Sequence, residues 1–573
     1  MSFVAGRGPK SGGPGVGAAA GSDGSGAPTA GSTGTGGAGT GGAGPETDAS
    51  GRAADGGAAG GSDGGGRARR WARRSAMPLL AAATGALPVL IFPTIGWWWF
   101  AYVCLVPLML VLRTAPNARR ALKLGWYGGI GFLVGVMSWL IPTLSVAILL
   151  LAALLGLFWG PWGWLVWRLL HGRPDALRAA AAIVLVPCGW MVIETIRSWQ
   201  YLGGPWGLLG ASQYQQHVAL VLASFGGVWL DSLLVVAVNT VLVVLIAAWG
   251  RSLVAYAALA GIAAGVLGVL AWAPQPRLTG ATATVGVVQP GGSANEADRT
   301  ARGETLTRTL AADRPDLVVW GESSLTDDLT TDPQLTAQLA ALSRQVGADL
   351  LVNVDAVQGN SGGIYKTSVL VGPQGLTGQR YDKIRLVPFG EYIPLRPVLG
   401  WISDLSKAAA VDRRRGTENV VMTVPEPDGR TLRIGPLICF ESAFPDMGRT
   451  LVNRGAQVIV VQSSTATFQD TAAPQQHASL AALRAAETGR PVVQATLTGV
   501  SVAYDPFGRM VGRPLTTADR GTAVYRVPLA TGSTLYDRWG NWVPSGCCLL
   551  VALSAAGWGL GSWANRRKTS SRA

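Results

Sequence analysis

The sequence predicts a polytopic α-helical membrane bundle joined to an α/β domain. Hydrophobic residues make up 49% of the 573-residue chain, charged residues only 14%, and 22 residues are tryptophan. Such a composition is unusual for a soluble protein and indicates that part of the chain lies in a membrane. Long apolar runs account for that part, whereas residues 275–540 alternate short β-rich runs with helical stretches, which is typical of an α/β domain.

The first 66 residues form a separate compositional region. They consist mainly of Gly, Ala, Ser, Thr and Pro with scattered acidic residues, and they show no apolar periodicity. A segment of this kind cannot bury enough apolar surface to offset the entropy of ordering it. We therefore expect residues 1–66 to be a disordered cytoplasmic tail.

Eight apolar runs each approach the roughly 20 residues that cross the hydrocarbon core of a bilayer. Seven lie within residues 67–274 and the eighth within 541–564, and the runs are 77–95, 97–114, 125–142, 144–169, 178–197, 219–248, 252–273 and 543–564. Buried core helices of a soluble protein are shorter, at about 10–14 residues. The sequence therefore predicts seven spans, then the α/β domain, then a final span.

The distribution of basic residues predicts the orientation of these spans. Arginines and lysines gather at 67–74, in alternate loops between the runs, and in the tail at 565–573, whereas the other loops carry almost no charge. By the positive-inside rule both termini are cytoplasmic and residues 275–540 lie outside the cytoplasm. The same rule explains the net charge of +14. No nucleic-acid-binding motif accompanies this charge, so we do not expect the protein to bind nucleic acid.

The domain at 275–540 contains eight β-rich runs and four helical stretches. The strands are expected at 282–288, 316–320, 349–354, 367–371, 431–439, 458–462, 492–496 and 522–527, and the helices near 294–312, 332–346, 445–454 and 474–489. About 260 residues are enough for a sizeable core.

Three residues at or just after these strands could carry out acyl chemistry. Cys439 supplies a nucleophilic thiol, the carboxylate of Glu322 can remove its proton, and the Lys383 ammonium can stabilise a tetrahedral oxyanion. Each residue also has a purely structural interpretation. Cys439 could be a small buried hydrophobic residue, Glu322 an acid at a helix N-terminus, and Lys383 an ordinary charge in a loop. The other four of the five cysteines lie in apolar runs, and no spacing of Cys and the three His residues suggests a metal site.

The residues around these three resemble a known family. WGESS (320–324), YDKIRLVPFGEYIP (381–394), ICFESAFP (438–445), AAETGRP (485–491) and GNW (540–542) resemble the signatures of the apolipoprotein N-acyltransferases. These are membrane-anchored members of the nitrilase superfamily. The resemblance extends over about 77–564 and implies a nitrilase-like αββα sandwich at 275–540.

The resemblance also implies roles for individual residues. Glu322 would be the base, Lys383 the oxyanion stabiliser and Cys439 the nucleophile. Glu391 would orient Lys383 or the thiol, and Phe440 and Glu441 match positions beside the nucleophile. The implied reaction moves an acyl chain from a phospholipid to Cys439, and then to the α-amine of a diacylglyceryl-cysteine at an apolipoprotein N-terminus. It takes place at the cell membrane and requires no metal or organic cofactor.

The chain departs from the family pattern at several positions. SSTATF (463–468) replaces a run that usually contains Asn, Asp and Trp, Lys366 replaces an Asn, and Phe440 replaces a Tyr. We expect these changes to affect the acyl-chain pocket or its rim more than the three central residues. Two alternatives stay open: a membrane-tethered nitrilase-like amidase that uses water as acceptor, and a degenerate paralogue that serves as a membrane scaffold.

Overall fold

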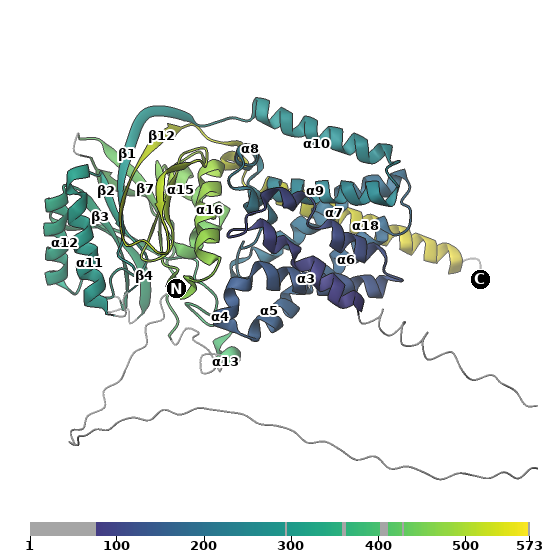
Figure 1. The fold of residues 1–573 in the computed structure, drawn as a ribbon, viewed down its shortest axis with the longest axis horizontal. Coiled ribbons are helices and arrows are strands. Elements are labelled where there is room, and N and C mark those ends of the chain that lie inside the picture. Colours follow the sequence, from purple (N-terminus) through teal and green to yellow (C-terminus); the bar gives the residue numbers. More distant parts are fainter. Residues whose placement is uncertain (1–75, 293–294, 358–362, 401–410, 427–428, 571–573) are drawn as a thin grey trace, which may run out of the picture. The chain divides into compact units, whose positions relative to one another are not determined.

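The computed structural model describes residues 76–570 except 293–294, 358–362, 401–410 and 427–428. The predicted tail at 1–66, the basic cluster at 67–74 and the last three residues lie outside the described residues. Within the described part, the α/β domain and the apolar helices are both present (Figure 1).

Two six-stranded sheets form the centre of the α/β domain. The first has the order β12-β1-β2-β3-β4-β5 and the second β11-β10-β9-β8-β7-β6. In each sheet three central strands are parallel, β1-β2-β3 and β7-β8-β9, and the flanking strands are antiparallel. The bounds are β1 Arg277–Gln289, β2 Leu317–Trp320, β3 Asp349–Val357, β4 Ile364–Gly372, β5 Gly375–Asp382, β6 Met422–Pro425, β7 Thr431–Ile438, β8 Val458–Ser463, β9 Val492–Thr496, β10 Ser501–Tyr504, β11 Met510–Leu515 and β12 Gly521–Thr531.

Helices cover the outer faces of both sheets. In Figure 1, α11 (Glu296–Thr309) and α12 (Pro333–Val346) lie on the first sheet, while α15 (Pro445–Asn453) and α16 (Ala473–Thr488) lie on the second. Apolar residues of β1, β2 and β3 meet those of β7, β8 and β9 in one buried cluster between the sheets. The domain is therefore a four-layered αββα sandwich, as the family resemblance implied.

The remaining helices are apolar. Within the described residues four helices are long and apolar enough to cross a membrane: α7 (Ala176–Arg197), α9 (Val228–Ala247), α10 (Leu253–Trp272) and α18, whose apolar part is Trp542–Leu560. Two bent pairs raise this number to six if each is one span: Ala118–Val136 with Ser138–Leu144, and Ala147–Gly156 with Trp159–Leu170. The first two predicted runs coincide with shorter apolar helices, Ala76–Ile91 and Trp98–Arg113.

The predicted run 219–248 is not one continuous helix. Gly227 has a φ of +72° and separates α8 (His217–Gly226) from α9. A Cβ on Gly227 would lie 2.6 Å from a ring carbon of Tyr536, so the ring occupies the place of a side chain. The positive φ ends α8 because side-chain-bearing residues rarely adopt it.

Helix α16 connects the sandwich to the apolar helices. All but one of its residues are buried, and it contacts α8 and α15 as well as β9. At its end Glu487 accepts a hydrogen bond of 2.8 Å from the backbone N–H of Val228, the first residue of α9. Arg484 pairs with the same carboxylate at 2.7 Å, and both side chains are buried. A hydrogen bond from the backbone thus ties the end of α16 to the start of α9, and the ion pair within α16 holds the accepting carboxylate in place.

Replacing Glu487 by Gln should destabilise the protein strongly. The substitution leaves the buried Arg484 cation without a counter-ion, and breaking a buried pair from one side costs about 3–5 kcal/mol. Thermal unfolding in detergent should show a clear drop in melting temperature. The matched control is Glu304→Gln, which breaks the exposed Arg308–Glu304 pair on α11 and should change stability by about 0–1 kcal/mol.

Candidate active site

Three of the predicted residues follow strands at one edge of the sandwich. Glu322 comes two residues after β2, Lys383 directly after β5, and Cys439 directly after β7. Parallel strands present the residues that follow them at the same edge of a sheet, which is where α/β proteins assemble sites. Cys439 has a φ of +51° and Ser323, next to Glu322, a φ of +53°. Both turns therefore hold strained backbone at the site.

The Lys383 ammonium lies between two carboxylates. Its Nζ donates hydrogen bonds to Glu322 Oε1 at 3.1 Å and to Glu391 Oε1 at 2.7 Å. The other oxygen of Glu391 accepts from the Val387 backbone N–H, and Glu322 Oε2 accepts from that of Ser464. All three charged side chains are buried. Glu391 is thus placed to orient Lys383 rather than the thiol.

Glu441 connects the loop after β5 with the turn that carries Cys439. Its Oε1 accepts hydrogen bonds from the Tyr381 hydroxyl and from the backbone N–H groups of Ile384 and Arg385, at 2.7–3.0 Å. Its Oε2 accepts from the Ile438 N–H at 2.8 Å. Because one carboxylate binds both segments, it fixes the position of the Lys383 loop relative to the turn that carries Cys439.

Lys366, on β4, lies in the same cluster of charges. Its Nζ is 3.1 Å from Glu322 Oε1, 3.4 Å from Asp355 Oδ2 and 3.7 Å from Glu391 Oε1. The expectation that this departure from the family pattern affects mainly the acyl-chain pocket is therefore wrong for Lys366. A lysine in the middle of an antiparallel strand gives no sequence signal of a site, because its partners depend on strand register.

These contacts set the ionisation of the acid and the thiol. Burial alone would raise the pKa of Glu322, but the Lys366 and Lys383 ammonium groups outweigh it and hold the pKa well below its usual value. Burial and the charge of Glu322 raise the pKa of the Cys439 thiol. At neutral pH the site therefore contains a carboxylate and a protonated thiol, the state in which a general base is needed.

Cys439 opens into an apolar cavity of about 220 Å³ between the sandwich and the helices. Phe440, Ser464, Thr465 and Phe468 of the sandwich contribute to it. From the helices and their loops come Met137, Trp139, Leu140, Thr143, Leu144, Leu151, Leu155, Tyr201, Leu202, Gly203 and Trp206. The altered run 463–468 thus contributes both to the cavity wall and, through the Ser464 N–H, to the binding of Glu322.

His477 of α16 also lines this cavity. Its Nε2 lies 3.1 Å from both the Cys439 carbonyl oxygen and Ser442 Oγ, and its ring stacks on Trp206. Burial lowers the pKa of His477 to about 4. The ring is neutral at physiological pH and supports the Cys439 turn by hydrogen bonding.

Comparison with known proteins identifies both parts of the chain. Residues 84–241 match the apolipoprotein N-acyltransferase N-terminal domain, and residues 284–536 match the carbon-nitrogen hydrolase domain. The apolipoprotein N-acyltransferase of Azotobacter vinelandii is 32% identical over 520 residues, which cover 86% of this chain and 96% of the relative. The chain belongs to the apolipoprotein N-acyltransferase family.

Other members of the family show similar agreement. The apolipoprotein N-acyltransferases of Gloeobacter violaceus and Geobacter metallireducens are 32% and 28% identical and cover 84% and 83% of this chain. Among solved structures, Nit3 of Saccharomyces cerevisiae, a nitrilase-superfamily member, is 18% identical and covers 44% of this chain and 90% of its own, with a TM-score of 0.33. As a member of the apolipoprotein N-acyltransferase family, the chain is an acyltransferase enzyme with a nitrilase-like domain and apolar helices that fit association with a membrane.

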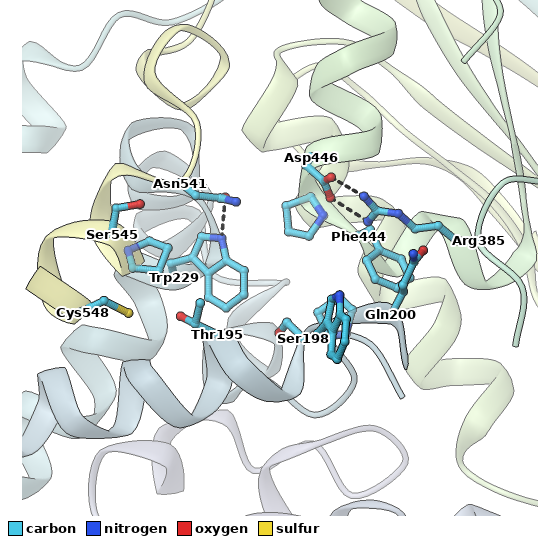
Figure 2. A pocket seen from close by; sticks show the side chains of 14 residues that line it. Thr195, Ser198, Gln200, Trp229, Arg385, Phe444, Asp446, Asn541, Ser545 and Cys548 are labelled. Atoms are coloured by element: carbon cyan, nitrogen blue, oxygen red, sulfur yellow. Dashed lines mark hydrogen bonds and ion pairs between the residues drawn. The ribbon is translucent and has the colours of Figure 1, made fainter. Parts of the chain in front are cut away.

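This member of the apolipoprotein N-acyltransferase family has a second cavity, of about 550 Å³, which is lined by Phe444. It lies on the side of Phe444 away from the Cys439 cavity. Figure 2 shows Arg385 paired with Asp446 on one side of it, and Trp229 paired with Asn541 on the other. The Phe444 ring meets the Phe440 ring edge to face, with centroids 4.9 Å apart. Phe440 lines the Cys439 cavity, so this pair of rings separates the two cavities.

Replacing Gly204 by Ala should disturb this pair of rings and slow acyl transfer. A Cβ on Gly204 would lie 2.7 Å from the outer ring carbons of both Phe440 and Phe444. Since a displacement of about 1 Å near a reacting group can cost 10²-fold in rate, we expect a loss of about 10- to 100-fold. Gly203→Ala is the matched control, because Gly203 also has a positive φ but a Cβ there meets no atom within 4 Å. Equal turnover by the two variants would show that the rings are not needed in this position.

Proposed function

We propose that the protein N-acylates apolipoproteins in two steps through a thioester on Cys439. One observation carries this proposal: the Cys439 thiol lies within the electrostatic influence of the buried Glu322–Lys383 pair and opens into an apolar cavity built partly by the membrane-type helices. A water-soluble substrate needs no such cavity, whereas an acyl chain does.

In the first step Cys439 attacks an ester carbonyl of a phospholipid. Glu322 accepts the thiol proton as the sulfur–carbon bond forms, and the Lys383 ammonium stabilises the tetrahedral oxyanion. The intermediate collapses by breaking the ester carbon–oxygen bond. Glu322 returns the proton to the leaving oxygen, which gives a lysophospholipid and S-acylated Cys439.

In the second step the neutral α-amine of a diacylglyceryl-cysteine attacks the thioester. The carbon–nitrogen bond forms, the carbon–sulfur bond breaks, and Glu322 transfers a proton from the amine to the departing sulfur. The products are an N-acylated apolipoprotein and free Cys439. In both steps Glu391 orients Lys383, Glu441 fixes the distance between the Lys383 and Cys439 loops, and Phe440 forms part of the acyl-chain wall.

The proposed setting is the cell membrane, crossed eight times. Residues 67–274 supply seven crossings, 275–540 the catalytic domain outside the cytoplasm, and 541–564 the eighth, with cytoplasmic tails at 1–66 and 565–573. In support, each predicted run coincides with an apolar helix or a pair of apolar helices, and the basic residues alternate between loops. The lipid substrates would then reach the cavity from the membrane.

The test follows both steps on the purified protein in detergent. A phospholipid with a mass-labelled acyl chain is added, and the intact mass is measured at mildly acidic pH. One hydroxylamine-labile acyl group per chain is expected, and a diacylglyceryl-cysteine peptide should then discharge it onto the amine. Decay of the thioester at the same rate without the peptide would favour the amidase. Absence of an adduct with any common phospholipid would favour the scaffold.

A further inference from the structure

Lys366 is a second buried ammonium group beside Glu322. It has no role in the two proposed steps. It lies on β4 and faces Asp355, its cross-strand neighbour on β3. Its side chain is almost wholly buried, and burying a lone ammonium is costly unless it is paired. Lys366 therefore interacts with charged groups inside the site and does not face solvent.

The carboxylates that contact the Lys366 ammonium come from three segments of the chain. They are Glu322 after β2, Asp355 on β3 and Glu391 in the loop after β5, while Lys383 is the like charge that faces the same carboxylates. Arg413 adds a further cation, with its Nε 3.3 Å from Asp355 Oδ1. Three carboxylates thus contact three cations, and the buried Arg299 adds a further positive charge that acts on Asp355.

Lys366 also holds the strained turn that carries the base. Its Nζ donates a hydrogen bond of 2.9 Å to Ser323 Oγ, and the Ser323 N–H donates to Asn353 Oδ1 at 2.8 Å. Ser323 is the residue with positive φ that directly follows Glu322. The direction of the Glu322 side chain therefore depends on the same ammonium that neutralises its charge.

Glu322 Oε1 receives both lysines at the same distance. Lys366 Nζ and Lys383 Nζ each lie 3.1 Å from this oxygen, while Oε2 accepts the Ser464 N–H. A carboxylate contacted by two ammonium groups stays ionised to lower pH than one contacted by a single ammonium. Lys383 alone would share its charge between Glu322 and Glu391.

We infer that Lys366 is a positioning residue for acyl transfer, which, with Asp355 as its counter-ion, keeps Glu322 ionised and directed toward the thiol. The inference rests on the proposed role of Glu322 as general base. The Lys366–Asp355 pair thus extends the cluster of Glu322, Lys383 and Glu391. It sets the pH range over which Glu322 can act as the base.

The direction of the effect follows from the charges. The active form needs ionised Glu322, and the two ammonium groups oppose burial to keep its pKa well below its usual value. Removing Lys366 raises the pKa of Glu322, so Glu322 becomes protonated at a higher pH. The acid limb of the pH–rate profile therefore moves to higher pH. Removing Asp355 takes a negative charge away, which lowers the pKa of Glu322 and moves the acid limb to lower pH.

The experiment measures the single-turnover rate of thioester formation on the full-length protein from about pH 2.5 to 9, so that an acid limb set by the lowered pKa of Glu322 falls inside the range. The variants are Lys366→Asn, Lys366→Arg, Asp355→Asn and the double variant with Asn at both positions. We expect Lys366→Asn to move the acid limb upward by about one pH unit, a roughly tenfold loss on that limb. Lys366→Arg should keep the limb near that of the wild type, and the double variant should bring it back toward the wild type.

Two results would overturn the inference. One is an acid limb of Lys366→Asn that coincides with that of the wild type. The other is an equal loss of rate at every pH in Lys366→Asn and the double variant, which a purely structural role would produce. If Lys366→Asn does not fold, Asp355→Asn retains the lysine, and an acid limb that fails to move downward overturns the inference. Failure of the wild type to form a thioester would instead contradict the proposed function.

Discussion

Replacing Cys439 by Ala should abolish both thioester formation and acyl transfer. In the proposed mechanism the Cys439 sulfur takes the acyl chain, and none of the other four cysteines lines the cavity at Cys439. Loss of a nucleophile that acts in both steps typically costs about 10⁴-fold or more. Intact-mass measurement after incubation with labelled phospholipid should show no adduct, and the peptide acceptor should stay unmodified.

The control uses the other four cysteines. Cys104, Cys188, Cys547 and Cys548 all lie in or beside apolar helices. A variant with Ala at these four positions and Cys439 intact should still carry one acyl group. An adduct that persists in Cys439→Ala and disappears in the four-site variant would place the nucleophile elsewhere and contradict the proposed mechanism.

Replacing Glu322 by Gln should lower the rate of both steps by about 10²- to 10⁴-fold, the usual contribution of a general base. The amide keeps the shape of the side chain but cannot accept the thiol proton, whose pKa burial raises. The rate of lysophospholipid release measures the first step. Transfer from pre-formed acyl-enzyme to the peptide measures the second.

This substitution also leaves Lys366 and Lys383 with one carboxylate fewer, so stability has to be measured separately. Glu391→Gln is the informative comparison, because it removes a carboxylate from the same lysines without removing the proposed base. A Glu322→Gln variant that is no slower than Glu391→Gln would mean that proton transfer to Glu322 does not limit the reaction.

The apolar central strands predicted an α/β domain, whereas the two-sheet sandwich was expected only from the family resemblance. The five residues of β9 and the four of β2 are buried throughout, and such runs are easy to recognise. The strands that were not predicted, β5, β6, β10 and β11, lie toward the edges of the sheets. In β5 seven of eight residues are at least partly exposed, so apolar alternation is nearly absent.

The candidate site divides in the same way. Glu322, Lys383 and Cys439 could be predicted, since each closes or follows a predicted strand or lies in a long motif. The partners Lys366, Asp355 and Asn353 could not, because their position depends on the register between β3 and β4. Opposite charges directly across two antiparallel strands, as in Asp355 and Lys366, become a recognisable pair only once that register is known.

The burial of α16 on all sides has a practical consequence for the biochemistry of this enzyme. Its apolar surface is continuous with that of α8 and α9, so the second sheet and the apolar helices share a single hydrophobic cluster. A fragment cut at residue 275 would expose this surface to water and should aggregate rather than behave as a soluble nitrilase. Detergents that loosen the helices should also slow acyl transfer, so lipid nanodiscs provide the check on rates measured in detergent.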